Sequence, residues 1–203
     1  FVGAHDFRSF SHRPSKENSI REITDLLIET PYGYLIGLAE QYERYSNPLV
    51  LEAMLDRLYY GNLWESLNKL VDENEVRQVI GTEIDLKNLL YLFSFKYMKM
   101  ESDLLKEMII NVRHKLPRSL IPELIATSYE KIPRLLTWPP YAELGKRAVE
   151  LIGKEMLIET EYLFSQYLYS YAETSALRKP NNLVYMFTYL CFCFREARNL
   201  TAL

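Results

Sequence analysis

Glycine, cysteine and long apolar runs are scarce in this chain. Only 7 of its 203 residues are glycine and 2 are cysteine, which is too few cysteines for a disulfide framework and is typical of a reducing compartment. No apolar run approaches the roughly 20 residues of a membrane-spanning helix. The formal net charge is −3, so no basic excess indicates binding to nucleic acid. The 48% apolar and 25% charged residues that are present are typical of a folded soluble protein of one or two domains.

A starting methionine and targeting signals are also missing. The chain begins at Phe1, and it ends at Leu203 without a nearby glycine or proline that would stop a helix. No stretch has the form of a signal or transit peptide. We therefore expect an internal piece of a longer protein.

Helical periodicity dominates, and the period-2 alternation of strands is rare. Ser19 and Glu22 form a capping box that predicts a first helix, and a short helix ending near residue 45 follows. Asn47 is an expected N-cap, with Pro48 at the first helical position. After it, one long amphipathic helix is predicted by the leucines at positions 51, 55, 58, 63, 67 and 70.

The sequence pattern in the middle of the chain predicts a helix break, followed by a helix that is enclosed by others. Gly81 interrupts the helical pattern, Thr82 is placed to cap the next segment, and Asp85 would lie in its first turn. Apolar residues occupy more than one face of that segment, so we expect other helices to surround it. Further breaks are expected at residues 114–119 and near Gly153.

Two landmarks occur twice in the same order. Asp85 and Asn88 form an acid-x-x-Asn-Leu pattern that returns at Glu196 and Asn199, and the two asparagines are 111 residues apart (199 − 88 = 111). Upstream, LLIETPYGYL matches LLTWPPYAEL, with tyrosines 109 residues apart (141 − 32 = 109). The matches predict an internal duplication of an all-helical repeat of about 110 residues.

Cysteine and histidine give only weak signals for a metal site. Cys191 and Cys193 point in different directions on a helix, and no second pair completes a site. We expect both to be buried small apolar residues. His5, His12 and His114 are scattered through polar or loop-like sequence, where a surface or locally hydrogen-bonded role is favoured over catalysis.

Glu83 and Asp85 are two acids near the expected start of an apolar helix. One hypothesis is a general acid/base pair. The structural alternative is stronger, because acids in a first turn complement the helix dipole. Asp85 and Asn88 share a helix face, as do Glu196 and Asn199. We predict a repeated packing device that bonds to an adjacent turn or helix end, with partner binding as the other alternative. We assign no catalytic, cofactor-binding or metal-binding residue.

Tyrosine is abundant, with 16 residues, and most of it should fill the core or interfaces. Tyr59 and Tyr60, or Tyr167 and Tyr169, are candidates to face a partner, because tyrosine is favoured at interfaces. A last helix is expected after Asn182, which is a suitable N-cap.

Several stretches resemble the C-subunit family of archaeal and bacterial A/V-type rotary ATPases, whose eukaryotic counterpart is the d subunit of the vacuolar ATPase. They are IGTEIDLKNLLYL (80–92), LEAMLDRLYY (51–60), the two L-x-x-x-P breaks followed by tyrosine, and the closing EARNL (196–200). The resemblance extends from about residue 19 to residue 203.

The resemblance implies an all-α fold with two related helical repeats of a funnel-shaped, pseudo-threefold protein. We expect repeats at 19–112 and 113–203, the second one truncated at its C-terminus, after an N-terminal segment 1–18 of uncertain origin. The family's role implies a non-catalytic central-stalk (rotor) protein that couples the rotor shaft to the membrane proteolipid ring for proton or sodium transport. Its partners would be the other central-stalk subunits and that ring. It would be peripheral, on the cytoplasmic face of the membrane, with no cofactor, nucleic acid or small-molecule substrate.

A second resemblance gives an alternative. Residues 1–23, FVGAHDFRSFSHRPSKENSIREI, resemble the G-x-H-D-F-x-x-F segment and the following V-R-x-I of the tRNA pseudouridine synthase family. That family's catalytic aspartate motif, of the R-T-D-x-G-V-H-A type, does not occur in this sequence. The helical pattern elsewhere and the acidic balance of charge argue against an α/β enzyme that binds RNA. A fragment of such a synthase is the alternative hypothesis.

Overall fold

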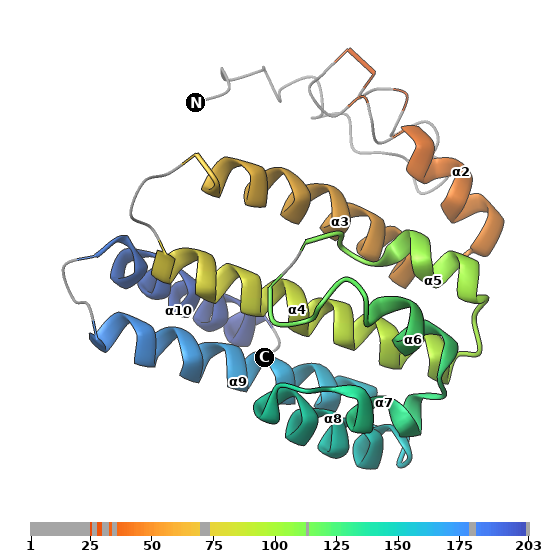
Figure 1. The fold of residues 1–203 in the computed structure, drawn as a ribbon. Coiled ribbons are helices and arrows are strands. Elements are labelled where there is room, and N and C mark those ends of the chain that lie inside the picture. Colours follow the sequence, from red (N-terminus) through yellow and green to blue (C-terminus); the bar gives the residue numbers. More distant parts are fainter. Residues whose placement is uncertain are drawn as a thin grey trace. The chain divides into compact units, whose positions relative to one another are not determined.

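The computed structural model describes residues 25, 28, 29, 33, 36–69, 74–112, 114–178 and 182–201, and it leaves out the side chains of 36, 38, 41, 194, 195 and 197–201. Every regular element in these ranges is a helix (Figure 1), which confirms the all-α prediction. The predicted capping box at 19–22 lies outside them. Internal contacts divide the chain into two compact units, 1–54 and 55–203. The predicted repeats and the funnel stay predictions.

The described part of the first unit contains helix α2, Ile36–Tyr45, and the start of α3, Pro48–Leu67. The N–H of Leu49 donates to Asn47 Oδ1 at 2.9 Å, so Asn47 caps α3. Pro48 takes the first helical position, where its missing N–H leaves no hydrogen bond unmade. The predicted helix start is confirmed, and the long helix after it continues to Leu67. The last leucine of the predicted pattern, Leu70, lies outside the described residues.

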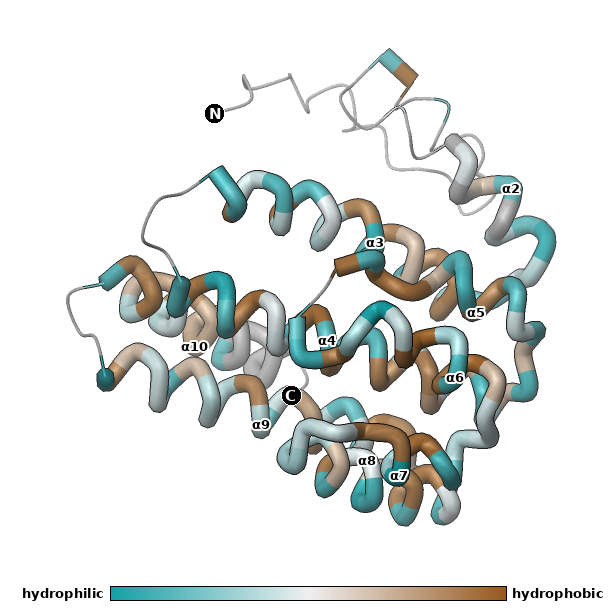
Figure 2. The backbone as a smooth tube through the Cα atoms, viewed as in Figure 1, coloured by the Kyte–Doolittle hydropathy of each residue, from teal (hydrophilic) through white to brown (hydrophobic). Residues whose placement is uncertain are grey.

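Helix α4, Asn74–Tyr97, is the centre of the second unit, and side chains on all its faces are buried. The helices in contact with it include α5 (Ser102–Met108), α8 (Pro139–Ile152), α9 (Leu157–Arg178) and α10 (Leu183–Thr201). Apolar residues, brown in Figure 2, occur in every one of these helices between hydrophilic ones. The prediction of an enclosed helix is therefore confirmed.

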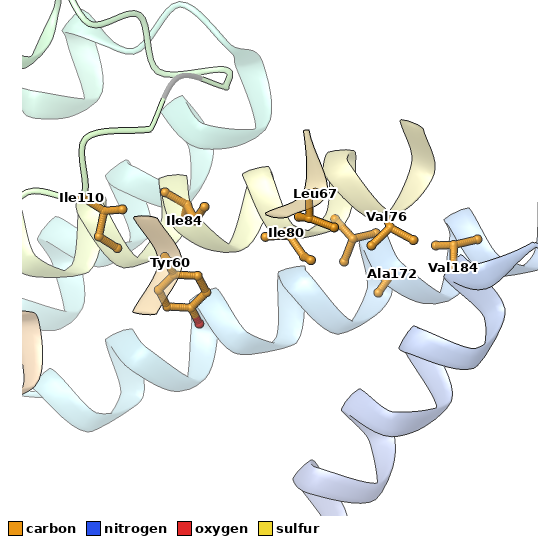
Figure 3. Close-up of a cluster of buried hydrophobic side chains, with 9 residues drawn as sticks. Tyr60, Leu67, Val76, Ile80, Ile84, Ile110, Ala172 and Val184 are labelled. Atoms are coloured by element: carbon orange, nitrogen blue, oxygen red, sulfur yellow. The ribbon is translucent and has the colours of Figure 1, made fainter. Parts of the chain in front are cut away.

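One part of the core lies where α3, α4, α9 and α10 meet. Side chains from these helices and from the loop after α5 form one buried cluster (Figure 3): Tyr60, Leu67, Val76, Val79, Ile80, Ile84, Ile110, Ala172 and Val184. Because its members come from positions 60 to 184, the cluster joins the first and last helices of this unit. Burial of such side chains contributes roughly 1.5–3 kcal/mol each.

Gly81 does not interrupt α4, which corrects the prediction made from the sequence. The helix begins at Asn74 and has Glu75 in its first turn, so Thr82 is not a cap and Asp85 lies in the interior. Glycine is required at this position by the packing of a neighbouring side chain. A Cβ at position 81 would lie 2.6 Å from Cγ of His114, so only glycine admits this ring so close to the helix.

The connection from α5 to α8 is made of short elements. A loop at 109–120 leads to α6, Ile121–Ala126, a 3₁₀ turn, Tyr129–Lys131, and α7, Ile132–Leu135. The polar loop predicted at 114–119 is confirmed.

The last two breaks also agree with the sequence. A turn at 153–156 separates α8 from α9, close to Gly153 as predicted. The N–H of Val184 donates to Asn182 Oδ1 at 3.1 Å, so Asn182 caps α10. None of the described helices is both long enough and apolar enough to cross a membrane.

Candidate functional site

Asn88 holds the loop after α5 through a pair of buried hydrogen bonds. Its Nδ2 donates to the carbonyl oxygen of Ile110 at 3.1 Å, and its Oδ1 accepts from the N–H of Ile110 at 2.8 Å. The amide thereby pairs with both main-chain groups of one loop residue, much as a neighbouring strand would. Without it, the N–H of Ile110 would lose its partner at a cost of about 1–3 kcal/mol, whereas the carbonyl oxygen would keep the N–H of Val112 at 2.9 Å.

Asp85, one turn earlier on α4, binds the next part of the same loop. Its Oδ2 accepts from the N–H groups of Lys115 at 2.8 Å and Leu116 at 3.2 Å, and from the hydroxyl of Tyr141 at 3.1 Å. Its Oδ1 has no partner among the described residues. Burial raises the pKa of Asp85 to about 6, against the opposing effect of these hydrogen bonds.

Lys115 links this loop to two more helices. Its Nζ donates to Thr82 Oγ1 at 3.2 Å and to the hydroxyl of Tyr171 at 3.3 Å. It also lies over the rings of Tyr171 and Trp138, 4.4 and 5.1 Å from their centroids. The hydroxyl groups and the aromatic faces both attract the ammonium, so Lys115 holds the loop against α4, α9 and Trp138.

His114 is half-buried and lies 3.4 Å from Thr82 Oγ1 through its Nε2. Burial, and then the charge of Lys115, lowers the pKa of His114 to about 4, so the ring is neutral at pH 7. The predicted locally hydrogen-bonded role is confirmed for this histidine. His5 and His12 lie outside the described residues.

These contacts bear out the packing role predicted for the first polar pair. Asp85 and Asn88 bond to main-chain groups of Ile110, Lys115 and Leu116, which belong to the loop after α5. The second pair is not tested, because the side chain of Asn199 lies outside the described part of the chain, while Glu196 is exposed.

Glu83 has hydrogen-bond partners that differ from those of Asp85. The hydroxyl of Tyr60 donates to Glu83 Oε1 at 2.8 Å, and burial raises the pKa of Glu83. Its side chain lines a cavity of about 220 Å³ between α3, α4 and α9, together with Lys87 and Tyr169. Residues two positions apart on a helix point in different directions, and here each acid has its own partners. The acid/base hypothesis is therefore not supported.

The burial of the two cysteines differs from the prediction made from the sequence. Cys191 is half-buried, and Cys193 is exposed, so the expectation that both are buried is wrong. Burial raises the pKa of Cys191 to about 11, which keeps it a thiol. The error has a simple cause: neighbours two apart on a helix cannot share one buried face. Among the described residues, no cluster of three or more potential metal ligands occurs.

Sequence reasoning missed the partners of the polar pair. Lys115, Tyr141 and Tyr171 come from a loop and two helices that lie 30 to 86 positions beyond Asp85 (115 − 85 and 171 − 85). The sequence did single out Tyr141, because it is the tyrosine of the second repeated Pro-Tyr stretch. Of the tyrosines proposed to face a partner, Tyr60 is buried and Tyr59 is 61% exposed.

The fold and this polar cluster define an all-helical protein whose buried polar side chains bind its own loop. The chain belongs to the family described as ATP synthase (C/AC39) subunit, whose model matches residues 5–203. This confirms the resemblance stated above. The synthase alternative is not favoured, because the match includes most of the segment that suggested it.

Two curated relatives share one name, that of the C subunit of the A-type ATP synthase. The one from Methanosarcina mazei is 27% identical over 207 residues, which cover 98% of this chain and 54% of the relative. The one from Methanococcoides burtonii is 27% identical over 188 residues, which cover 92% and 51%. The chain thus spans about half the length of the curated relatives it matches. No solved structure gives a significant match.

Proposed function

We propose that this chain is a non-catalytic part of the central stalk of an A/V-type ATPase, where it couples the rotor shaft to the membrane proteolipid ring. It would work as a peripheral protein on the cytoplasmic face and serve proton or sodium transport. The observation that carries the proposal is the family match over residues 5–203, together with two relatives named as the C subunit of the A-type ATP synthase.

The packing supports a mechanical role. A part that transmits torque must resist deformation, and close-packed interiors have low compressibility. The central helix α4 is enclosed by other helices, and its polar side chains bind main-chain groups of the loop after α5. Buried hydrogen bonds of this kind hold the loop in one position against α4.

The proposal is tested by reconstituting the ATPase with and without this protein. We expect the tagged protein to recover the shaft subunits and the proteolipid ring, and a carbonate wash to release it from membranes. Without it, ATP hydrolysis should continue while ATP-driven ion uptake into vesicles is lost. Recovery of neither partner, or ion uptake at the normal rate without the protein, would refute the proposal.

A further inference from the structure

A second cavity, of about 310 Å³, lies between α3, α5, α6 and the loop after α5. Its lining has two parts. The floor is aliphatic and consists of Ile109, Ile110, Val112, Ile121 and Ile125, and the rim carries the cations Arg57, Lys106 and Arg118. The volume is in the range of ordinary ligand pockets.

The charged side chains of the rim are all cationic, because no acidic side chain belongs to the lining among the described residues. Arg57 Nη1 donates to the main-chain oxygen of Glu107 at the end of α5, which orients the guanidinium and leaves its other N–H groups for a ligand. Lys106 pairs with Asp103 at 2.7 Å, but both side chains are mostly exposed. Such a pair contributes little and exchanges readily.

Asn111 adds a neutral polar group to this cavity. Its side chain is exposed, and an amide both donates and accepts, as the main chain of a peptide requires. The lining therefore offers cations for carboxylates, an aliphatic floor for one apolar side chain, and an amide for a main chain.

We propose that this cavity binds a short acidic segment of a partner protein, in which carboxylates flank an aliphatic side chain. Arg57 and Arg118 bind the carboxylates, and the isoleucine floor takes the aliphatic side chain. This inference does not depend on the identity of the ATPase partners proposed above.

A peptide fits these features better than a membrane surface does. The net charge of the whole chain is −3, which opposes its approach to an anionic bilayer. The three cations also surround a cavity with an apolar floor, and a flat bilayer surface cannot fill such a cavity.

The test is fluorescence anisotropy with a fluorescein-labelled, C-terminally amidated peptide of sequence EELEE. We expect saturable binding that weakens several-fold between 50 and 300 mM salt, because salt screens exposed charges. The peptides KKLKK and EESEE should bind more weakly.

Arg118→Glu should weaken binding of EELEE about tenfold, which corresponds to about 1.4 kcal/mol. Ile121→Ser should weaken EELEE more than EESEE.

Arg147→Glu is the matched control, because Arg147 is an exposed cation on α8 outside this cavity. It changes net charge equally and should leave the affinity near that of the unaltered protein. Circular dichroism should show unchanged helicity for each variant. The proposal is overturned by absence of binding, by equal losses in Arg118→Glu and Arg147→Glu, or by Arg118-dependent binding only to phosphatidylserine vesicles.

Discussion

Asp85 is an acid whose charge costs free energy in the folded state, and this makes the stability of the protein depend on pH. Its folded pKa of about 6 exceeds the ordinary value of 3.8, so the folded chain binds this proton more tightly than the unfolded chain does. Oδ1, which has no described partner, can take the proton while Oδ2 keeps its three donors. The contribution of Asp85 to stability is therefore largest below pH 3.8 and is lost as the pH rises through 6.

Asp85→Asn should remove this dependence. Between pH 7.5 and pH 4, the unaltered protein should gain up to about 2–3 kcal/mol in free energy of unfolding relative to Asp85→Asn. Urea unfolding of both proteins at several pH values measures the difference. His114 acts in the opposite direction, because its pKa is lowered to about 4, but it is present in both proteins. A difference that stays constant with pH would contradict the assignment.

The close approach of His114 to Gly81 predicts that substitutions at these two positions have strongly non-additive effects on the free energy of unfolding. Gly81→Ala alone should destabilise the protein by about 1–3 kcal/mol, because the new Cβ overlaps the imidazole ring. In a His114→Ala background the same substitution should stabilise it by about 0.5–1 kcal/mol, because alanine is the better helix former. A double-mutant cycle by urea unfolding measures the coupling. Equal effects of Gly81→Ala in both backgrounds would show that the ring does not require the glycine.

These residues show how far side-chain chemistry can be predicted from the sequence. The spacing of Asp85 and Asn88 was enough to predict a shared face and a bond to a nearby turn. It could not reveal that Lys115 and Tyr141 complete the cluster, because those contacts depend on the tertiary fold. Gly81 was misread for the same reason: a glycine that breaks a helix and one that admits a ring look alike in sequence.

At the scale of the elements, the turn after α8 uses a residue that sequence reasoning would not choose. Gly153 has a φ of −61°, in the right-handed helical region, whereas Glu155 has a φ of 63°, in the left-handed region. The N–H groups of Glu155 and Met156 donate back to Ile152 and Leu151, which closes the helix end. A break near residue 153 could be predicted, but which residue takes the left-handed conformation depends on how α9 packs back onto α8.

Glu155→Gly should therefore stabilise the protein by about 0.5–1 kcal/mol, because glycine adopts the left-handed conformation without a Cβ penalty. Glu150→Gly is the matched control. Glu150 is exposed near the end of α8, where glycine should cost about 1 kcal/mol. Thermal unfolding of the two variants measures both changes, and destabilisation by both would show that the left-handed conformation carries no strain.

At the scale of the whole molecule, the all-α class and most helix breaks in the described residues could be predicted, because periodicity, prolines and asparagine caps are local signals. The order in which helices surround α4 could not, since that order depends on which apolar faces match in three dimensions. The predicted repeat boundary at 112/113 crosses the second unit, 55–203, and it remains a prediction. The polar loop beside that boundary is bound to Asp85 of α4 through its main chain and to Tyr171 of α9 through the side chain of Lys115.

Because other helices enclose α4, we expect it to be the part of the second unit most protected from hydrogen exchange. Amides in the middle of α4 can exchange only when the helices around it separate, so their protection should approach the global stability. In α10 the side chains of Met186 and Tyr189 are each 64% exposed, and that helix can open at lower cost. Hydrogen exchange followed by mass spectrometry should therefore find residues 79–95 slowest and residues 185–193 much faster. If α10 exchanged as slowly as α4, the second unit would open as one cooperative block, and α4 would not be its most stable element.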